Sequence, residues 1–247
     1  MEWWNDWFDD RYLRFAVGLT NERTEREVVG IDELLVLPSG SRILDVACGH
    51  GRHAIPLANR GYNVTGIDVL PWAIGQARHA SAGTKSVDFR VQDMRTLDEH
   101  EVYDGAIFIN TTLGAFEDPS DDLTVLHNIR NALRMGGPLI LDCRHRDSIV
   151  RQCPPKPDFW EINGAIVRET WTFDPVTAIR EGQISWLEDN QLFSKPPTRS
   201  RYYTIPQLRD LVVEGGFAVE GLYGGFSREE ISLDAHLIML LRKVEAV

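Results

Sequence analysis

Short apolar runs alternate with amphipathic segments between residues 43 and 143, and this alternation constrains the fold more than any other feature. The runs are typical of buried strands, and they fall at Ile43–Ala47, Asn63–Asp68, Val87–Val91, Tyr103–Ile109 and Pro138–Cys143. Three segments between them are predicted helices: His53–Arg60, Pro71–Ala80 and Ser120–Arg134. Strands interleaved with helices of this length predict right-handed crossovers and a mostly parallel sheet that is covered on both faces.

The third predicted helix shows its start and end signals most clearly. We expect Ser120 to be its N-cap, and Asp121 and Asp122 suit the positive end of the helix dipole. The segment Met135–Pro138 holds two glycines and a proline, and it then ends the helix.

The pattern changes after Arg151. Three later runs alternate with a period near two, at Trp160–Phe173, Ala178–Leu192 and Thr198–Tyr203. Turn signals separate them at Asp174-Pro175 and at Lys195-Pro196-Pro197. This arrangement predicts an antiparallel meander inserted into the main fold.

The remaining segments complete the predicted fold. We expect Thr204 to cap a helix that has Pro206 in its first turn and that ends at Gly215-Gly216. Two strands then follow, Phe217–Tyr223 and His236–Arg242, and two helices precede the first strand, Trp3–Phe15 and Thr20–Leu37. The sum is a seven-stranded α/β sheet with an N-terminal helical cap and an antiparallel β insertion.

Charge narrows the partners and the location. The chain has 26 Lys and Arg residues and 37 Asp and Glu residues, so its formal net charge is −11. A negatively charged surface repels phosphate backbones, which argues against nucleic acid as a partner. The longest stretch without a charged residue or histidine, Gly105–Phe116, has 12 residues. A membrane-spanning helix needs roughly 20. The acidic start of the chain is opposite in sign to a secretory signal, so we expect no membrane association and a cytoplasmic location.

The cysteines predict neither a disulfide framework nor a metal site. Cys48, Cys143 and Cys153 are an odd number and contain no Cys-x-x-Cys pair. We therefore expect three buried free thiols and no bound metal.

A glycine-rich loop follows the first predicted strand. Gly49-x-Gly51-x-x-Ala54 fits the fingerprint of dinucleotide-binding loops, in which glycines allow a sharp turn and the amides of the next helix face an anion. Asp68 closes the second strand 19 residues after Gly49, where a carboxylate can accept hydrogen bonds from ribose hydroxyls. Both NAD and S-adenosylmethionine contain such a ribose.

Asp45 separates these two ligands. It lies four residues before Gly49, at the mouth of the loop, where its charge would repel a pyrophosphate and attract the ammonium of a methionyl group. Asp93 follows the third strand, 25 residues after Asp68, at a spacing that could place it beside an adenine amino group, with Met94 against the ring. Each acid alone could instead be a helix cap or a solvated loop charge. Together they favour an adenosine with a zwitterionic amino-acid tail.

Four motifs carry a family resemblance: Ile43–His53, Gly66-Ile67-Asp68, Gln92-Asp93-Met94 and Tyr103–Ile107. They resemble those of the class I S-adenosylmethionine-dependent methyltransferases, and the likeness covers residues 40–150. The N-terminal motif Trp4-x-x-Trp7-Phe8-x-x-x-Tyr12 resembles the start of a bacterial branch of this family whose members act on small molecules. The resemblance implies a Rossmann-like, doubly wound sheet in the order 3-2-1-4-5-7-6, with the last strand antiparallel.

The resemblance also implies roles for individual residues. Asp45 and Gly49 would hold the methionyl end of S-adenosylmethionine, Asp68 the ribose and Asp93 the adenine. Ala47 departs from the pattern, because many members have glycine there. The full set of expected cofactor-binding residues is Asp45, Ala47, Gly49, Gly51, Asp68, Val69, Asp93, Met94, Asn110, Tyr12 and Arg14.

The expected domains follow from the same comparison. Residues 39–152 and 204–247 would form the methyltransferase core, and residues 153–203 the β insertion. Residues 1–38 would form a helical lid over the cofactor, in which Tyr12 or Arg14 reaches the donor or the acceptor; the alternative is an apolar helix face packed on the sheet. The insertion would be a wall of the acceptor pocket or the surface of a homodimer.

The acceptor pocket of a parallel α/β sheet lies beyond the carboxyl ends of the strands, here at Asn110–Thr112 and Asp142–His145. His145 is the first candidate for a general base and His50 the second, because neutral imidazole titrates near the working pH. Either could also be an ordinary loop histidine. The segment Asn110–Leu113 replaces the Asn/Asp-Pro-Pro-aromatic loop of base and glutamine amine methyltransferases, which argues further against a nucleic-acid acceptor.

Three functional hypotheses remain at this point. The first is an enzyme that methylates a small, partly aromatic metabolite on O, N or C and leaves S-adenosylhomocysteine as the product. The second is a protein that keeps the fold and the cofactor but acts as a cyclase or a binding module. The third is an NAD-dependent oxidoreductase, which the Gly-x-Gly-x-x-Ala pattern supports and Asp45 opposes.

Overall fold

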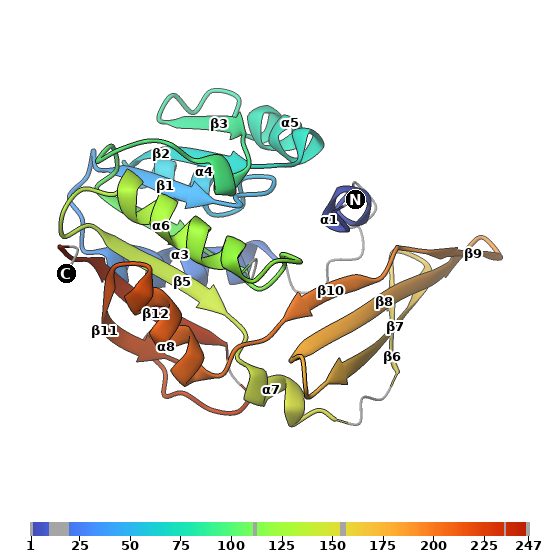
Figure 1. Ribbon diagram of the computed structural model, residues 1–247. Coiled ribbons are helices and arrows are strands. Elements are labelled where there is room, and N and C mark those ends of the chain that lie inside the picture. Colours follow the sequence, from blue (N-terminus) through green and yellow to red (C-terminus); the bar gives the residue numbers. More distant parts are fainter. Residues whose placement is uncertain (1, 10–19, 111–112, 154–156, 235, 246–247) are drawn as a thin grey trace.

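The computed structural model describes residues 2–9, 20–110, 113–153, 157–234 and 236–245. Its main feature is a seven-stranded sheet with the strand order β11-β12-β5-β4-β1-β2-β3 (Figure 1). The strands are β1 (Arg42–Val46), β2 (Asn63–Asp68), β3 (Val87–Val91), β4 (Gly105–Phe108), β5 (Pro138–Cys143), β11 (Phe217–Tyr223) and β12 (Leu237–Lys243). Strand β12 pairs antiparallel with β5 and β11, and the other pairs are parallel. The predicted order 3-2-1-4-5-7-6 is confirmed.

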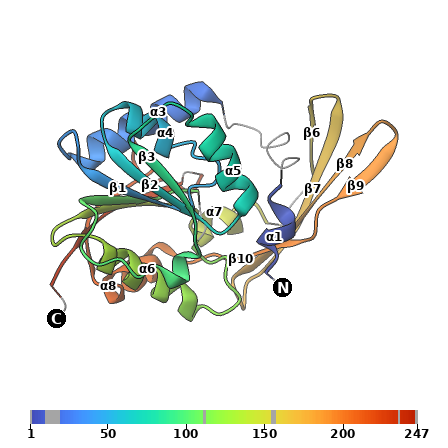
Figure 2. The same cartoon turned by 90° about the horizontal axis from the view of Figure 1, so that it is seen from above.

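Helices cover both faces of this sheet, as Figure 2 shows. On one face lie α3 (Asn21–Leu35), α4 (Ala54–Asn59) and α5 (Pro71–Ala80), and on the other lie α6 (Ser120–Ala132) and α8 (Ile205–Glu214). Two short helices, α1 (Trp4–Trp7) and α7 (Arg146–Val150), and a 3-10 turn η1 (Met94–Thr96) lie at the ends of the strands.

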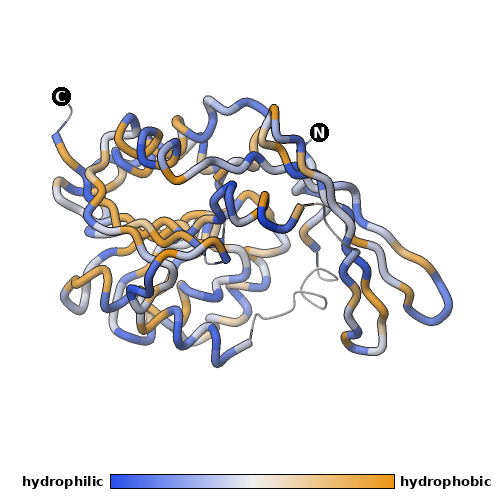
Figure 3. Tube along the Cα trace, turned by 90° about the horizontal axis from the view of Figure 1, so that it is seen from below, coloured by the Kyte–Doolittle hydropathy of each residue, from blue (hydrophilic) through white to orange (hydrophobic). Residues whose placement is uncertain are grey.

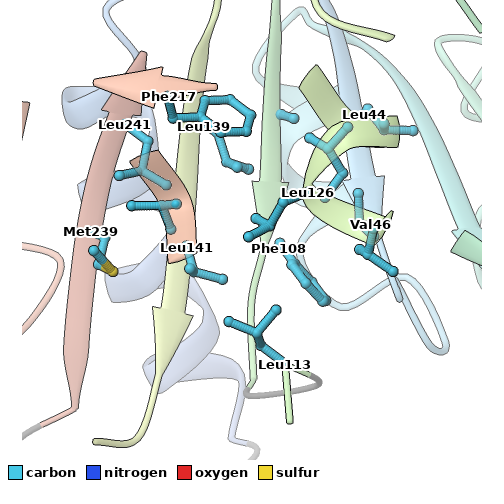
Figure 4. Close-up of a cluster of buried hydrophobic side chains, with 14 of the residues drawn as sticks. Leu44, Val46, Phe108, Leu113, Leu126, Leu139, Leu141, Phe217, Met239 and Leu241 are labelled. Atoms are coloured by element: carbon cyan, nitrogen blue, oxygen red, sulfur yellow. The ribbon is translucent and has the colours of Figure 1, made fainter. Parts of the chain in front are cut away.

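Alternate side chains of the strands point to opposite faces of the sheet and pack into two separate hydrophobic clusters. Ile43 of β1 packs with residues of α3, α4 and α5, whereas its neighbour Leu44 packs with Leu126 of α6 and Phe217 of β11. Figure 4 shows the second of these clusters. In Figure 3 the apolar residues gather along the central strands and the hydrophilic ones at turns. Among the described residues we find no helix with the length and apolar character that a membrane span needs.

A second, five-stranded antiparallel sheet projects from the core (Figure 1). It contains β6 (Asp158–Ile162), β7 (Ala165–Asp174), β8 (Ile179–Glu188), β9 (Gln191–Ser194) and β10 (Thr198–Arg201). The antiparallel insertion is confirmed, but two of its predicted runs were wrong as single strands. The turns at Asn163-Gly164 and Asp189-Asn190, all four residues with positive φ, divide each run into a hairpin.

Several local predictions need correction. Pro119, not Ser120, is the N-cap of α6, and the side chain of Asp118 accepts a hydrogen bond from the amide of Ser120 at 2.9 Å. The first predicted helix ends at Trp7 within the described residues, because Phe8 is extended. Helix α7 was not predicted. Cys153 is exposed, whereas Cys48 and Cys143 are buried, and all three are free thiols. The capping box of Thr204 with Gln207 confirms the predicted start of α8.

Candidate functional site

A cavity of about 220 Å³ lies at the carboxyl ends of β1, β2, β3 and β4. Eight of the predicted cofactor-binding residues line it: Asp45, Ala47, Gly49, Asp68, Val69, Asp93, Met94 and Asn110. Gly51 does not line it, and Tyr12 and Arg14 lie outside the described residues. Trp4 and Phe8 from the N-terminal segment also line the cavity, so this segment contacts the site. Its role as a lid stays a prediction.

The loop after β1 turns sharply because three of its residues adopt left-handed conformations. Ala47, Gly49 and Gly51 have φ values of 54°, 55° and 82°. Ala47 holds a conformation that glycine adopts more readily, which explains why many members of the resembled family have glycine at this position. At Gly51 a Cβ atom would lie 2.7 Å from the ring of Phe89, so close packing also requires glycine there.

Asp45 lines this cavity and has a side-chain oxygen without a partner among the described residues. Its side chain is 2% exposed, and Oδ2 has no hydrogen-bond partner among the described residues. Burial, assisted by the charge of Asp68, raises the pKa of Asp45 to about 8, although Arg52 and the Ala54 amide act in the opposite direction. A buried carboxyl group without a partner is costly, so a cationic ligand at this position would be stabilising.

Arg52 lines the same cavity and also has an unpartnered atom. Its Nη1 donates to Oε2 of Glu27 at 2.5 Å and to Oγ1 of Thr24 at 3.3 Å. Its Nη2 is buried and has no partner in the described part of the chain. The sequence analysis did not select Arg52, since an arginine in the first turn after a glycine loop carries no signal of its own.

Glu27 of α3 holds the loop in place. It accepts from Nε of Arg23 at 2.6 Å and from Arg52, and it lies 2.9 Å from Nε2 of the buried His53. Burial raises the pKa of Glu27, but hydrogen bonds from His53 and Arg23 and the charge of Arg52 outweigh it and bring the pKa to about 2. Glu27 is therefore ionised and binds Arg52 through Nη1, while Nη2 has no partner among the described residues.

Asp68 connects two loops. Its Oδ2 accepts from the Gly49 amide and its Oδ1 from the Leu70 amide, both at 2.9 Å. Burial raises the pKa of Asp68, and the hydrogen bonds from the Leu70, Gly49 and Val69 amides oppose this. With three amides donating, one of the four lone pairs of the carboxylate remains for a hydroxyl group in the cavity.

Asp93 lines the cavity, but its carboxylate is engaged by Arg95. Nη2 of Arg95 donates to Oδ2 of Asp93 at 2.6 Å and its amide donates to Oδ1 at 2.9 Å. Burial raises the pKa of Asp93, but the hydrogen bonds and charge of Arg95 prevail and hold it below its usual value. Arg95 also pairs with Glu2 and Asp121 and lies 4.9 Å from the ring centroid of Phe116.

The two predicted base candidates occupy different places. His50 lines the cavity, and burial together with the charges of Arg52 and His53 lowers its pKa. His145 caps α7, is 1% exposed and does not line the cavity; its Nε2 lies 3.4 Å from the Ser232 carbonyl oxygen. The structure therefore does not bring His145 together with the other predicted residues.

A second polar cluster adjoins the cavity at Asn110. The Asn110 amide donates to Oδ2 of Asp142 at 3.3 Å, and Oδ1 of Asp142 lies 2.9 Å from Nδ1 of His236. The sequence analysis missed this histidine. One signal could have found it: His236 opens the last, antiparallel strand, which starts at the edge where the parallel strands end.

We compared the chain with known proteins. Residues 43–137 match the family model described as "Methyltransferase domain". The ubiquinone biosynthesis O-methyltransferase of Idiomarina loihiensis is 24% identical over 212 residues, which are 84% of this chain and 76% of that one. The S-adenosyl-L-methionine-dependent Diels-Alderase iliD of a Neonectria species is 44% identical over 69 residues, 28% of this chain. The chain spans only about a quarter (27%) of the length of that relative.

Solved structures agree with the fold. The CcbJ methyltransferase of Streptomyces caelestis superposes with a TM-score of 0.83 at 17% identity and covers 98% of both chains. CalS10, an amino pentose methyltransferase from Micromonospora echinaspora, superposes with a TM-score of 0.70 at 19% identity, over 94% of this chain and 95% of that one. These likenesses show that the described chain has the fold of these enzymes.

Proposed function

We propose that this protein transfers a methyl group from S-adenosylmethionine to a small molecule. Its residues 43–137 match a methyltransferase domain, and its fold is that of the S-adenosylmethionine-dependent methyltransferases. The acceptor atom is an oxygen, nitrogen or carbon, and S-adenosylhomocysteine is the second product. The acidic net charge of −11 supports a small-molecule acceptor over a nucleic acid.

One observation carries the proposal: a buried carboxyl group and a buried guanidinium, both from residues that line the cavity, each have one atom without a partner among the described residues. Oδ2 of Asp45 can receive a cationic ammonium, and Nη2 of Arg52 can donate to a carboxylate. In an amino acid, an ammonium group and a carboxylate group are attached to the same carbon. The cavity therefore suits the methionyl end of S-adenosylmethionine.

The remaining lining residues fit the nucleoside. Asp68 has a free lone pair for a ribose hydroxyl, and Val69 and Met94 supply apolar surface for a purine ring. Asp93 would meet the adenine amino group only by sharing an oxygen with Arg95, because Arg95 already donates to both oxygens. Asn110 lies on the β4 side of the cavity, where an acceptor would approach the donor.

S-adenosylmethionine supplies a methyl group on a sulfonium sulfur, which is already a good leaving group. The protein's residues then have to hold the two reactants at about 3–3.5 Å and exclude water. Trp4, Phe8 and Phe116 line the cavity with aromatic surface, and the rings of Trp4 and Phe116 are 5.6 Å apart. These side chains provide the dry wall that the reaction needs.

A second candidate function keeps the cofactor but not the transfer. The match to a Diels-Alderase over 69 residues favours a protein that binds S-adenosylmethionine and directs a cyclisation. The dinucleotide alternative has no support from the cavity, since Asp45 would face the pyrophosphate with a buried acid.

Calorimetry with S-adenosylmethionine and S-adenosylhomocysteine tests cofactor binding, and we expect micromolar affinity for both. A fluorescence titration with NADH is the control, and no saturable binding is expected. Tight NADH binding without binding of either sulfur compound would overturn the proposal.

Incubation with methyl-labelled S-adenosylmethionine and a panel of catechols, phenols and amino sugars tests transfer. We expect a labelled acceptor and one equivalent of S-adenosylhomocysteine. Unchanged S-adenosylmethionine together with a rearranged or cyclised panel compound would favour the second candidate function.

A further inference from the structure

Asp142 and His236 form a carboxylate–imidazole pair beside the cavity, in which the carboxylate is buried. Asp142, the fifth of the six residues of β5, is 2% exposed, and its Oδ1 lies 2.9 Å from Nδ1 of His236. The two residues are 94 positions apart in the chain, and the antiparallel pairing of β12 with β5 brings them together. The side chain of His236 is 35% exposed, so the imidazole reaches from the buried acid to the surface.

The pair is connected to the cavity through Asn110. Oδ2 of Asp142 accepts the Asn110 amide at 3.3 Å, and Asn110 lines the cavity. Asn110 has φ of 71°, a left-handed conformation that a non-glycine residue adopts at a cost of about 1 kcal/mol or more. His236, Asp142, Asn110 and Asp45 lie on or next to four neighbouring strands, β12, β5, β4 and β1, near the carboxyl ends of the three parallel ones.

The contact with Asp142 decides which ring nitrogen of His236 carries the proton. An acceptor-only carboxylate at Nδ1 requires Nδ1–H, so in the neutral ring the lone pair is on Nε2. We find no hydrogen bond to Nε2 among the described residues. Nε2 is therefore available to take a proton, and Asp142 would stabilise the imidazolium that results.

Neither other histidine considered so far has this arrangement. His50 lines the cavity, but its prominent charged neighbours are Arg52 and His53, which disfavour the protonated ring. His145 is 1% exposed and its Nε2 faces a backbone carbonyl.

We propose that His236, oriented by Asp142, is the general base of the reaction. The proposal rests on the proposed function, because it names the residue that removes the proton which a hydroxyl or ammonium acceptor must lose. Nε2 of His236 takes that proton while a lone pair of the acceptor atom forms the bond to the methyl carbon. The electron pair of the breaking carbon–sulfur bond stays on sulfur, which becomes a neutral thioether, and the imidazolium then returns the proton to solvent.

The tautomer is the first test and needs no acceptor. Nitrogen-15 histidine spectra of the full chain, with and without S-adenosylhomocysteine, report which ring nitrogen is protonated, and His236→Gln assigns the signals. We expect Nδ1–H with a bare Nε2, and a shift toward Nε2–H in Asp142→Asn. A proton on Nε2 in the unmodified protein would overturn the proposal.

The second test separates chemistry from binding, with the panel compound that the unmodified enzyme methylates as the probe. His236→Gln should lower kcat by ~10²–10⁴-fold. Its affinity for S-adenosylhomocysteine should stay within a factor of about two, because His236 does not line the cavity. His79→Gln, an exposed residue of α5, is the matched control.

The outcomes are distinct. Unchanged kcat in His236→Gln overturns the proposed base while the proposed function stands. Loss of S-adenosylhomocysteine binding by the unmodified protein overturns the proposed function itself. If the protein binds the cofactor but methylates no panel compound, the tautomer of His236 decides the inference alone.

Discussion

At the scale of single residues, the cavity is lined by two ionisable side chains that each have one atom without a hydrogen-bond partner among the described residues. Asp45 is a buried acid, and no group among the described residues donates a hydrogen bond to its Oδ2. Arg52 is held by Glu27 through one nitrogen and leaves the other for a ligand. Such groups reduce the stability of the empty protein, and a ligand that pairs with them recovers that free energy as binding.

Cofactor binding should therefore release a proton from Asp45. With a pKa of about 8, Asp45 is mostly protonated in the empty protein at pH 7, and a bound ammonium group lowers that pKa. Because the bound state holds fewer protons, affinity should rise as the pH increases toward about 8 and level off above it. Calorimetry at pH 7 in two buffers of different ionisation enthalpy measures the release. Asp45→Asn should bind more weakly and release none; equal heats in both buffers for the unmodified protein would contradict this.

Asp68 should contribute to binding through hydrogen bonds. Asp68→Ala removes the ribose acceptor and also the partner of the Gly49 amide, so we expect affinity for S-adenosylhomocysteine to fall by about 1–3 kcal/mol. Asp68→Asn keeps one acceptor oxygen and should lose less. Calorimetry of both variants measures the difference, and equal affinity of Asp68→Ala and the unmodified protein would exclude the ribose role.

At the scale of elements, α3 and α4 hold the glycine loop against the sheet. Gly51 lies where this packing is tightest, with φ of 82° and the ring of Phe89 2.7 Å from an added Cβ. Gly51→Ala should destabilise the fold by about 1–3 kcal/mol. Gly75→Ala in α5 is the control, because nothing lies within 4 Å of its Cβ position. It should stabilise by about 0.5–1 kcal/mol. Urea unfolding of both variants measures the difference, and equal effects would disprove the packing argument.

The contacts of Glu27 should make α3 sensitive to acid. Its pKa is about 2 in the folded protein against 4.5 for the free side chain, so its contribution to stability is complete above pH 4.5 and is lost as the pH falls toward 2. Glu27→Gln should cost about 3 kcal/mol at pH 7, and less as the pH falls below 4.5. Denaturant unfolding at pH 7 and pH 4 gives both values. Glu33→Gln on the exposed face of α3 should change neither, and a cost for Glu27→Gln that does not depend on pH would contradict the linkage.

At the scale of the whole molecule, α1 lies between the core and the small sheet (Figures 1 and 2). The ring of Trp4 packs on Phe116 of the core, and Asp9, which follows α1, pairs with Lys195 after β9 at 2.5 Å. The N-terminal segment thus connects the two sheets at the cavity. Its role as a lid and the exact domain boundaries stay predictions, as does the cytoplasmic location.

The homodimer expected through the β insertion also stays a prediction, and the structure identifies the face to test. Ile166, Leu187 and Leu192 are directly opposite one another on β7, β8 and β9 and are 53%, 41% and 76% exposed. If a second copy covers this row, Leu187→Glu should shift sedimentation from dimer to monomer. Val213→Glu on α8, 58% exposed, is the control. A monomer at all concentrations of the unmodified protein would exclude the dimer.

Much of the fold could be predicted because its signals are local. The bounds of β2, β3, β5, β11 and α5 agree with the predicted ranges, since apolar periodicity and capping residues act within a few positions. The hairpin turns at Asn163-Gly164 and Asp189-Asn190 were equally local, but the period-two pattern continued through them and concealed them. Asp45, Gly49 and Asp68 line the cavity for a related reason: they end parallel strands, whose carboxyl ends must meet at one edge.

Sequence alone determined the alternation of strands and helices, the glycine loop and the acids at the strand ends, because periodicity, turn chemistry and charge are properties of neighbouring residues. The strand order came from the family resemblance. Only the tertiary structure decided how those charges are paired. It paired Asp93 with Arg95 and His236 with Asp142, and it buried His145 away from the cavity. Within the described part of the chain it left Arg52 Nη2 and Asp45 Oδ2 without partners. Contacts between residues 94 positions apart depend on which strands become neighbours, and no spacing along the chain encodes them.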